Sequence, residues 1–388
     1  MRSDRHSQPS GWPAMNRHTF VLSLGLVACL LGCADDSPPA AGAGSAVPLL
    51  EESPLRFERK TPALGRTPPL DTLRLARSFG GSEDFSGITD VALVGQNLVV
   101  IDRFMSPHLA VVDLPSGSIS RRLGRDGEGP GEFRVPVPAA YRGEEPGHLW
   151  IYDFSNRRMT LMDIRKPGRD AVRKEFRLGA KASILIPVWM GSHLVANGLY
   201  GDFTLLVMDD GGWPVARVGA APPFRPELTR IPGARQANRG FIAADPRGER
   251  MALAYQFASR VDFFGPEGAR YGTVQGPRAV TARYHIDGTG RFRWKDDNEM
   301  AHWGMAATQR YVYTLFCGCK LLTGNESPAL LHVYDWEGRF VAELALDRPI
   351  RSLAVSPDDA ILYGGYEEPY PAVGEWRLPA SLREPSAR

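Results

Sequence analysis

The stretch His108-Leu-Ala-Val-Val-Asp113, followed by the turn residues Ser116 and Gly117, decides the fold, because versions of it return along the whole chain. Each version is a short apolar strand with a polar or glycine turn beside it and further apolar runs around it. The other versions are Arg158-Met-Thr-Leu-Met-Asp163, Thr204-Leu-Leu-Val-Met-Asp209, Arg260-Val-Asp-Phe-Phe264 and Leu331-His-Val-Tyr-Asp335. One such unit cannot bury its own apolar face, so the recurrence predicts an array of strand repeats packed against one another.

The beginning of the chain carries a different signal. An apolar run from Phe20 to Gly32 is too short to cross a bilayer and has the length of the core of an export signal. It ends in Leu30-Leu31-Gly32-Cys33, which resembles the bacterial lipobox. By that resemblance residues 1–32 form a lipoprotein signal peptide, and Cys33 is lipidated and becomes the mature N-terminus. Leu26-Val27-Ala28-Cys29 is a second candidate box, and an uncleaved anchor helix is the remaining alternative.

The same resemblance implies a location. Two or more acyl chains hold a protein on a bilayer almost permanently, so the membrane is an expected partner, reached through a lipid anchor. Ala34 stands where, by resemblance to enterobacterial sorting, an aspartate would retain a lipoprotein in the inner membrane. We therefore expect a lipid-anchored protein of the bacterial cell envelope, attached to the outer membrane on its periplasmic or surface side.

Composition separates a linker from a folded body. Seven prolines and no periodic apolar pattern lie between residues 34 and 70, so we expect residues 33–70 to be the lipidated N-terminus and a flexible, disordered linker. Removing residues 1–32 takes three arginines and one aspartate from 46 basic and 44 acidic residues, which leaves 43 of each. A net charge near zero argues against a nucleic-acid partner.

The repeats divide residues 71–379 into six units, and residues 380–388 form a tail. The units cover about 88–124, 137–179, 185–219, 239–275, 302–347 and 350–379. Many of their strands are apolar at consecutive positions, which is typical of strands covered on both faces. The sixth unit lacks one strand, and Thr72 to Phe79 is an unassigned strand before the first unit. Joining the two predicts an all-β, six-bladed β-propeller that is closed by an N-terminal strand and leaves no open end.

Two passages strengthen this interpretation. Leu123 to Phe133 is a glycine-rich turn, and His148 to Arg158 is a strand followed by a turn that contains Asp153 and Asn156. Both resemble the segments between and within blades of NHL-type and related six-bladed β-propellers found in bacterial lipoproteins. The resemblance covers about residues 72–379, and its motifs are matched in the first two blades. Asp153 and the turn glycines have structural roles in this interpretation.

Candidate metal ligands are sparse. The body contains Cys317 and Cys319, in a Cys-Gly-Cys sequence that is compatible with free structural cysteines, a disulfide or a metal site. The six body histidines never occur at i, i+2 or i, i+4 spacing. We therefore expect no metal and no cofactor. Zinc-dependent lyases of the NHL type need several histidines that converge on the channel, and here His302 alone is placed at the entrance of an inner strand.

Two long loops, 220–238 and 276–301, should enter inner strands and meet at one end of the central channel. Long loops in compact repeats are functional or mobile, and arginines mixed with aromatic residues are frequent at binding surfaces. Solvated arginines paired with nearby acids are the structural alternative. The predicted binding face contains Arg239, His302, Trp303, Arg351, Arg283 and Arg293.

These patterns favour a membrane-anchored binding module without catalytic residues, whose ligand is a protein, a carbohydrate or an anionic small molecule. The alternative is a propeller lyase or hydrolase with a metal in the central channel. Fold alone does not choose between them, because propellers serve binding, catalysis and scaffolding alike.

Overall fold

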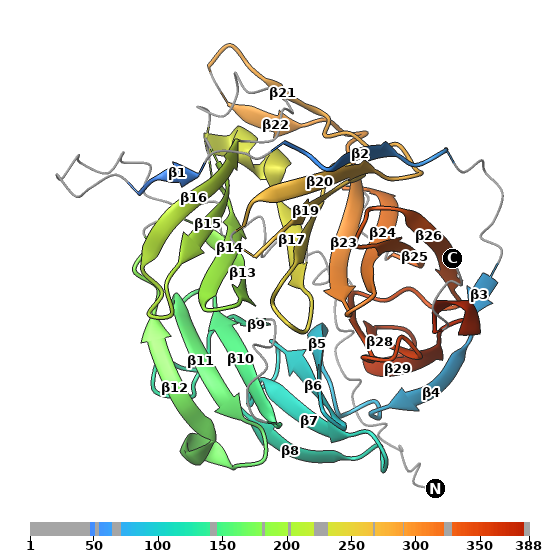
Figure 1. Ribbon diagram of the computed structural model, residues 1–388. Coiled ribbons are helices and arrows are strands. Elements are labelled where there is room, and N and C mark those ends of the chain that lie inside the picture. The colour runs from blue at the N-terminus through green and yellow to red at the C-terminus, as the bar shows by residue number, and fades with distance from the viewer. Residues whose placement is uncertain are drawn as a thin grey trace, which may run out of the picture. The chain divides into compact units, whose positions relative to one another are not determined.

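The computed structural model describes residues 47–50, 54–63, 71–139, 146–180, 183–200, 203–220, 232–266, 268–289, 291–321 and 328–383. Six sheets of four or five strands form a ring, which confirms the six-bladed β-propeller (Figure 1). The innermost strands surround the axis of the ring, and we call this axial region the channel. Cys33, the signal peptide and the end of the tail lie outside the described residues. Within the described part of the chain, no helix is long and apolar enough to cross a membrane.

Each blade begins with an inner strand at the channel and continues outward through antiparallel neighbours. Blade 1 contains β5 (Ile88–Val94), β6 (Asn97–Asp102), β7 (Leu109–Asp113) and β8 (Ile119–Leu123). Blade 2 contains β9 (Pro136–Pro138), β10 (His148–Asp153), β11 (Arg158–Asp163), the short 3-10 helix η2 (Gly168–Ala171) and β12 (Val172–Arg177). Blade 3 contains β13 (Ile184–Met190), β14 (His193–Gly198), β15 (Phe203–Met208) and β16 (Pro214–Ala220).

The second half of the chain repeats the arrangement. Blade 4 contains β17 (Gly240–Ala244), β18 (Met251–Tyr255), β19 (Arg260–Phe264) and β20 (Arg270–Gln275). Blade 5 contains β23 (Glu299–Ala307), β24 (Tyr311–Lys320), β25 (Leu330–Asp335) and β26 (Phe340–Leu346). Blade 6 contains β27 (Ser352–Val355), β28 (Ile361–Tyr366) and β29 (Ala372–Arg377), and its outer strand is β4 (Leu75–Phe79).

The N-terminal strand closes the ring as the sequence predicts. β4 pairs antiparallel with β29, with Phe79 opposite Val373. Phe79 is buried in an apolar cluster that joins blade 6 to blade 1. The predicted segment 72–79 is divided, however, because β3 (Asp71–Leu73) pairs parallel with β26 of blade 5 and not with blade 6.

The linker prediction is wrong for part of its length. β1 (Leu49–Leu50) pairs parallel with β16 of blade 3, and β2 (Phe57–Lys60) pairs parallel with β20 of blade 4. We call the described residues 47–50, 54–63 and 71–79 the N-terminal strap. The strap follows the outer edges of blades 3, 4 and 5 before it completes blade 6 (Figure 1, blue). The tail also begins in order, since η5 (Ala380–Leu382) buries Leu382.

Phe57 fixes the strap to the ring. Its ring stands edge-on to Phe263 and Tyr271, with centroids 5.7 and 5.8 Å apart. The ring occupies a slot between Gly272 and Gly338, where an added Cβ would lie 2.1 and 2.3 Å from Phe57 atoms. Any larger residue at either glycine would collide with the aromatic ring, so the blades keep this slot open for it.

The core explains why the strands are apolar at consecutive positions. An apolar cluster fills each of the six spaces between neighbouring blades. Leu98 to Ile101 of β6 are all buried, because alternate side chains face blade 6 and blade 2. Burying one large apolar side chain contributes roughly 1.5–3 kcal/mol, so these six spaces supply most of the stability.

Acidic side chains accept hydrogen bonds from main-chain amides where the chain enters the inner strands. The carboxylate of Asp153, at the end of β10, accepts hydrogen bonds from the amides of Arg134 (2.8 Å) and Val135 (3.2 Å) just before β9. Asp102 does the same in blade 1 for the amides of Ser86 (2.5 Å) and Gly87 (3.1 Å). The structural role expected for Asp153 is confirmed, and its carboxylate is occupied by main-chain donors.

Candidate functional site

The ring has two different faces. On the entry face the chain enters the six inner strands, and on the opposite tip face it turns from the first to the second strand of each blade. Because the inner strands surround the channel, residues just before them lie at its mouth. The channel mouth therefore brings together residues from all six blades.

Arg239 directly precedes β17 at this mouth. Its carbonyl accepts a hydrogen bond from the Gln256 amide (2.8 Å), which fixes the backbone. Its Nε is buried without a hydrogen-bond partner among the residues that the structure describes. The side chain is packed among many protein atoms but keeps part of its surface open. This burial lowers the pKa of Arg239 to about 10.

A carboxylic acid lies in the channel wall on blade 1. Asp90 is the third residue of β5, and burial raises its pKa to about 7, against a smaller opposing effect of Arg103. Arg103 follows β6 and stacks on Phe104, with the guanidinium carbon 5.3 Å from the ring centroid. Burial lowers the pKa of Arg103, and Asp90 partly restores it. Strongly shifted pKa values are frequent at functional sites.

Sequence reasoning missed Asp90 and Arg103. The available signal was an acid inside the apolar run Ile88-Thr-Asp-Val-Ala-Leu-Val94. Such an acid faces solvent in an ordinary edge strand, whereas here the strand is the innermost one and the acid is enclosed.

Arg351 lies at the mouth as expected, just before β27. Its amide donates to the Gly365 carbonyl (2.8 Å), and its Nε is 3.6 Å from an oxygen of Glu367. The nearby carboxylate offsets the charge of Arg351, so this arginine is less available to a ligand than Arg239.

The expectation for His302 is wrong. β23 begins three residues earlier than predicted, at Glu299, so His302 lies inside the strand and is fully buried. It contacts Phe316 edge-on (5.8 Å between centroids), and burial together with His332 lowers its pKa to about 3. His302 is therefore a neutral core residue. Trp303 is half-buried and packs beside two apolar clusters.

A polar network lies behind His302 in the space between blades 4 and 5. His332 Nε2 is 2.9 Å from Glu343, and Arg278 makes two bonds of 2.7 and 2.6 Å to the same carboxylate. These donors hold the pKa of Glu343 at about 2 although burial opposes them. Arg278, from the second long loop, is thus paired with an acid. Among the described residues no group of three or more His, Cys, Asp or Glu side chains could hold a metal ion.

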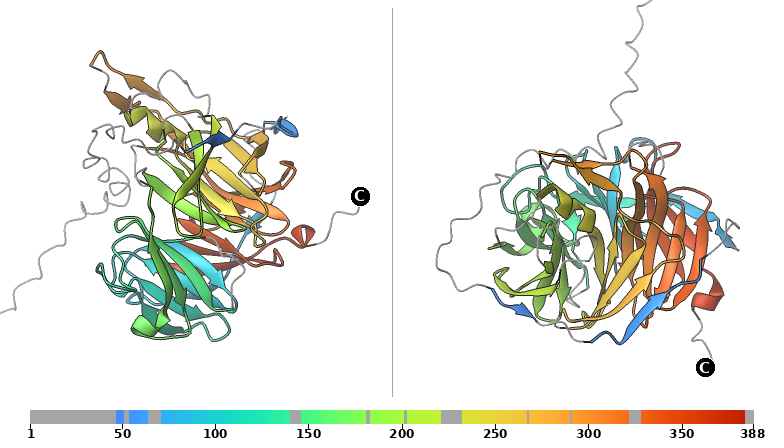
Figure 2. Two further views of the ribbon diagram at one scale, coloured as in Figure 1. Left: turned by 60° about the vertical axis from the view of Figure 1, so that its left-hand side comes forward. Right: turned by 90° about the horizontal axis from the view of Figure 1, so that it is seen from above.

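Arg283 and Arg293 belong to a hairpin rather than to the channel mouth. β21 (Tyr284–Ile286) and β22 (Phe292–Trp294) project from the ring (Figure 2). Arg283 pairs with Asp297 at 2.5 Å, and Arg293 is exposed opposite His285. The predicted binding residues therefore separate into mouth residues (Arg239, Arg351), hairpin residues (Arg283, Arg293) and packed residues (His302, Trp303).

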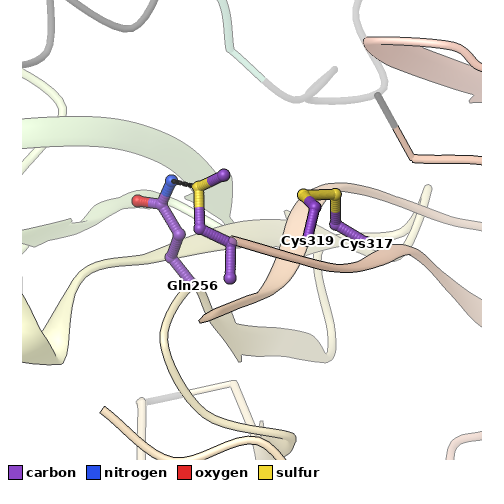
Figure 3. Close-up of a disulfide and its surroundings, with 4 residues drawn as sticks. Gln256, Cys317 and Cys319 are labelled. Carbon is purple, nitrogen blue, oxygen red and sulfur yellow. Dashed lines mark hydrogen bonds between the residues drawn. A yellow bond between two sulfur atoms is a disulfide. The ribbon is translucent and has the colours of Figure 1, made fainter. Parts of the chain in front are cut away.

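Cys317 and Cys319 form a disulfide at the end of β24 (Figure 3). Gly318 between them has a φ of +62°, a conformation that glycine adopts without strain. Cys319 is buried beside Met300 and Phe257, and the Gln256 amide group lies 3.8 Å from the Met300 sulfur. Of the three alternatives that the sequence left open, the disulfide is the one observed.

Comparisons with known proteins show the fold. No family model matches the sequence, and no curated protein matches it. A Bacteroides fragilis structure named "Putative exported protein" is similar, with 12% identity and a TM-score of 0.54 over 82% of this chain and 99% of that chain. The β-propeller domain of Cps50 (Swd1) from Myceliophteria thermophila has 12% identity and a TM-score of 0.45 over 79% and 100%. The WD40 repeats of RRP9 have 11% identity and a TM-score of 0.47 over 78% and 97%.

Proposed function

We propose that this protein is a lipid-anchored binding module of the bacterial cell envelope that holds an acidic group of its ligand at the channel mouth. The observation that carries the proposal is Arg239, whose guanidinium is packed at the mouth without a carboxylate partner among the described residues.

The physical argument concerns an uncompensated charge. Burying a cation without a counter-charge costs several kcal/mol, and folded proteins avoid this cost unless a partner offsets it. A carboxylate from a ligand would form a charge-assisted bond to Arg239, and such bonds are about twice as strong as neutral ones. Asp90 does not replace that partner below pH 7, because its own burial favours the neutral acid.

The proposed location at the membrane is supported by the sequence around Cys33, which resembles a lipobox, and by the short apolar run before it. The structural neighbour from Bacteroides fragilis is named as exported, which agrees with this location. Attachment through Cys33 would leave 13 residues between the anchor and the first strap residue, Val47.

The test uses an acidic sugar as the probe. We expect D-glucuronate to bind the purified protein in calorimetric titrations, D-glucose to bind at least tenfold more weakly, and Arg239→Gln to lose glucuronate binding. Arg293→Gln removes an exposed arginine on the hairpin and is the matched control, which should bind as the unchanged protein does. Equal binding of glucose and glucuronate, or equal loss in both variants, would contradict an acid-binding mouth at Arg239.

A further inference from the structure

A pocket of about 450 Å³ lies between the strap and the tip face of blades 4 and 5. The strap supplies Arg56, Phe57 and Arg59, and the blades supply Arg250, Tyr271 and Trp336. Small-molecule sites have volumes of roughly 300–1,000 Å³, apolar walls and a few polar groups, and this pocket has all three properties. It lies on the face opposite to Arg239.

Two arginines of the strap, Arg56 and Arg59, stack on aromatic rings of the pocket. The guanidinium carbon of Arg56 lies 5.5 Å from the centre of the Tyr271 ring, and that of Arg59 lies 5.2 Å from the centre of the Phe57 ring. Arg59 Nε donates to the main-chain oxygen of Glu337 (2.9 Å). Neither guanidinium forms an ion pair with a carboxylate in the part of the chain that the structure describes.

Arg250, in contrast, already has hydrogen-bond and ion-pair partners within the protein. Its Nε is 3.0 Å from the buried carboxylate of Asp245, its NH2 group donates to the Gln309 carbonyl (2.9 Å), and it stacks on Trp336 at 4.6 Å. Arg250 is therefore part of the wall, and the charges still available to a ligand are those of Arg56 and Arg59.

The remaining wall is aromatic and rigid. The hydroxyl of Tyr271 donates to the Trp336 carbonyl (3.0 Å), and burial raises its pKa to about 12, so it stays neutral. Phe57 is held in its glycine slot. Trp336 is buried under Arg250, whereas Tyr271 is half-buried, so Tyr271 is the ring that offers apolar surface to a ligand, with two guanidinium groups beside it.

Among the residues that the structure describes, the pocket rim carries one acid. The side chain of Glu337 is exposed at the pocket edge. Within this described lining, two available arginines and one carboxylate leave a single positive charge, which favours a ligand with one negative charge over a dianion. Guanidinium groups make paired hydrogen bonds to a carboxylate in a matching plane.

We propose that this pocket binds a small monocarboxylate with a planar apolar body, the carboxylate against Arg56 and Arg59 and the body against Tyr271. The arginines belong to the strap and Tyr271 belongs to blade 4, so the ligand bridges the strap and the ring. Binding therefore strengthens the attachment of the strap.

The test measures binding of phenylacetate, the probe, to the full chain by ligand-observed NMR. Phenylacetamide keeps the planar body without the charge, and acetate keeps the charge without the body. We expect phenylacetate to bind at least tenfold more tightly than either. The double variant Arg56→Gln/Arg59→Gln should lose this preference, and hydrogen exchange of the amides in residues 54–60 should slow when phenylacetate is added.

Lys60→Gln is the control. It removes a positive charge from the same strand outside the pocket, and it should bind phenylacetate like the unchanged protein, with an unchanged melting temperature. Arg239→Gln shows whether any phenylacetate binds at the channel mouth. Loss of binding in Lys60→Gln would mean that phenylacetate responds to the overall positive charge of the strap and not to the pocket. Loss of binding in Arg239→Gln alone would place the phenylacetate site at the channel mouth. No binding of phenylacetate, or equal binding of phenylacetamide, would overturn the proposal.

Discussion

Replacing Asp90 by asparagine should stabilise the protein, and by more as the pH rises. Burial raises the pKa of Asp90 from 3.8 to about 7. Below about pH 4 the acid is protonated in both the folded and the unfolded chain, so the free energy of unfolding is independent of this group. Between about pH 4 and 7 the unfolded chain has lost the proton and the folded chain has kept it, so the free energy of unfolding falls as the pH rises.

The size of the effect follows from the shift. One pKa unit corresponds to about 1.4 kcal/mol, so a shift of about three units costs at most about 4 kcal/mol above pH 7. Asp90 keeps part of its surface open to channel water, which weakens the penalty, and we expect about half of this value. Asp90→Asn abolishes the penalty, because the amide does not titrate.

Urea unfolding of both proteins at pH 5, 6, 7 and 8 measures the difference. The stability advantage of Asp90→Asn should grow by about 1 kcal/mol or more from pH 5 to 7 and then level off. Asp113→Asn is the control, since hydrogen bonds from Ser116 lower the pKa of Asp113 and keep it ionised throughout this range. An Asp90→Asn difference that is constant with pH, or that shrinks, would refute the burial argument.

Three further changes test the anchor, the strap and the disulfide. Cys33→Ser should give an unprocessed precursor without acyl labelling on electrophoresis. Phe57→Ala should lower the free energy of unfolding by about 3 kcal/mol, measured with urea, and expose the strap to proteases, because the alanine leaves the glycine slot empty; equal protease resistance would refute the role of this ring. The double variant Cys317→Ser/Cys319→Ser should cost only about 1–2 kcal/mol, since the disulfide closes a very short loop, and a thermal scan that shows complete unfolding at ambient temperature would contradict this.

The repeat was readable from the sequence because strand pairing within a blade is local. Each apolar run is followed by its partner after a short turn, as in β10 and β11, where His148 pairs with Asp163 and Asp153 with Arg158. The order of the blades, their strands and the closure by β4 could all be predicted on this basis.

The part of the strap before β4 could not be predicted, because nothing in its own sequence repeats. Its strands depend on positions far along the chain, such as the slot that Gly272 and Gly338 leave for Phe57. A proline-rich segment with isolated apolar residues has the composition of a linker, and only the shape of the blade edges makes it a set of strands.

The candidate site was predicted in part. Arg239 and Arg351 follow from blade topology, whereas His302 was misplaced because β23 begins early and departs from regular pairing around this residue. Asp90 was missed since its enclosure depends on the channel, which forms only when six blades meet.

The strap also has a consequence for the order in which the molecule can be completed during synthesis. Ser78 of β4 bonds the Tyr366 hydroxyl at 2.7 Å, and the two residues are 288 positions apart in the chain. β4 emerges from the ribosome before the strands of blade 1, and it waits for the last blade before it finds its partner. Until then blade 6 has no outer strand and blade 1 has an uncovered apolar face. A chain that stops before about residue 372 cannot close, so a truncated product is open to proteases and chaperones, and the cell can distinguish it from a finished one.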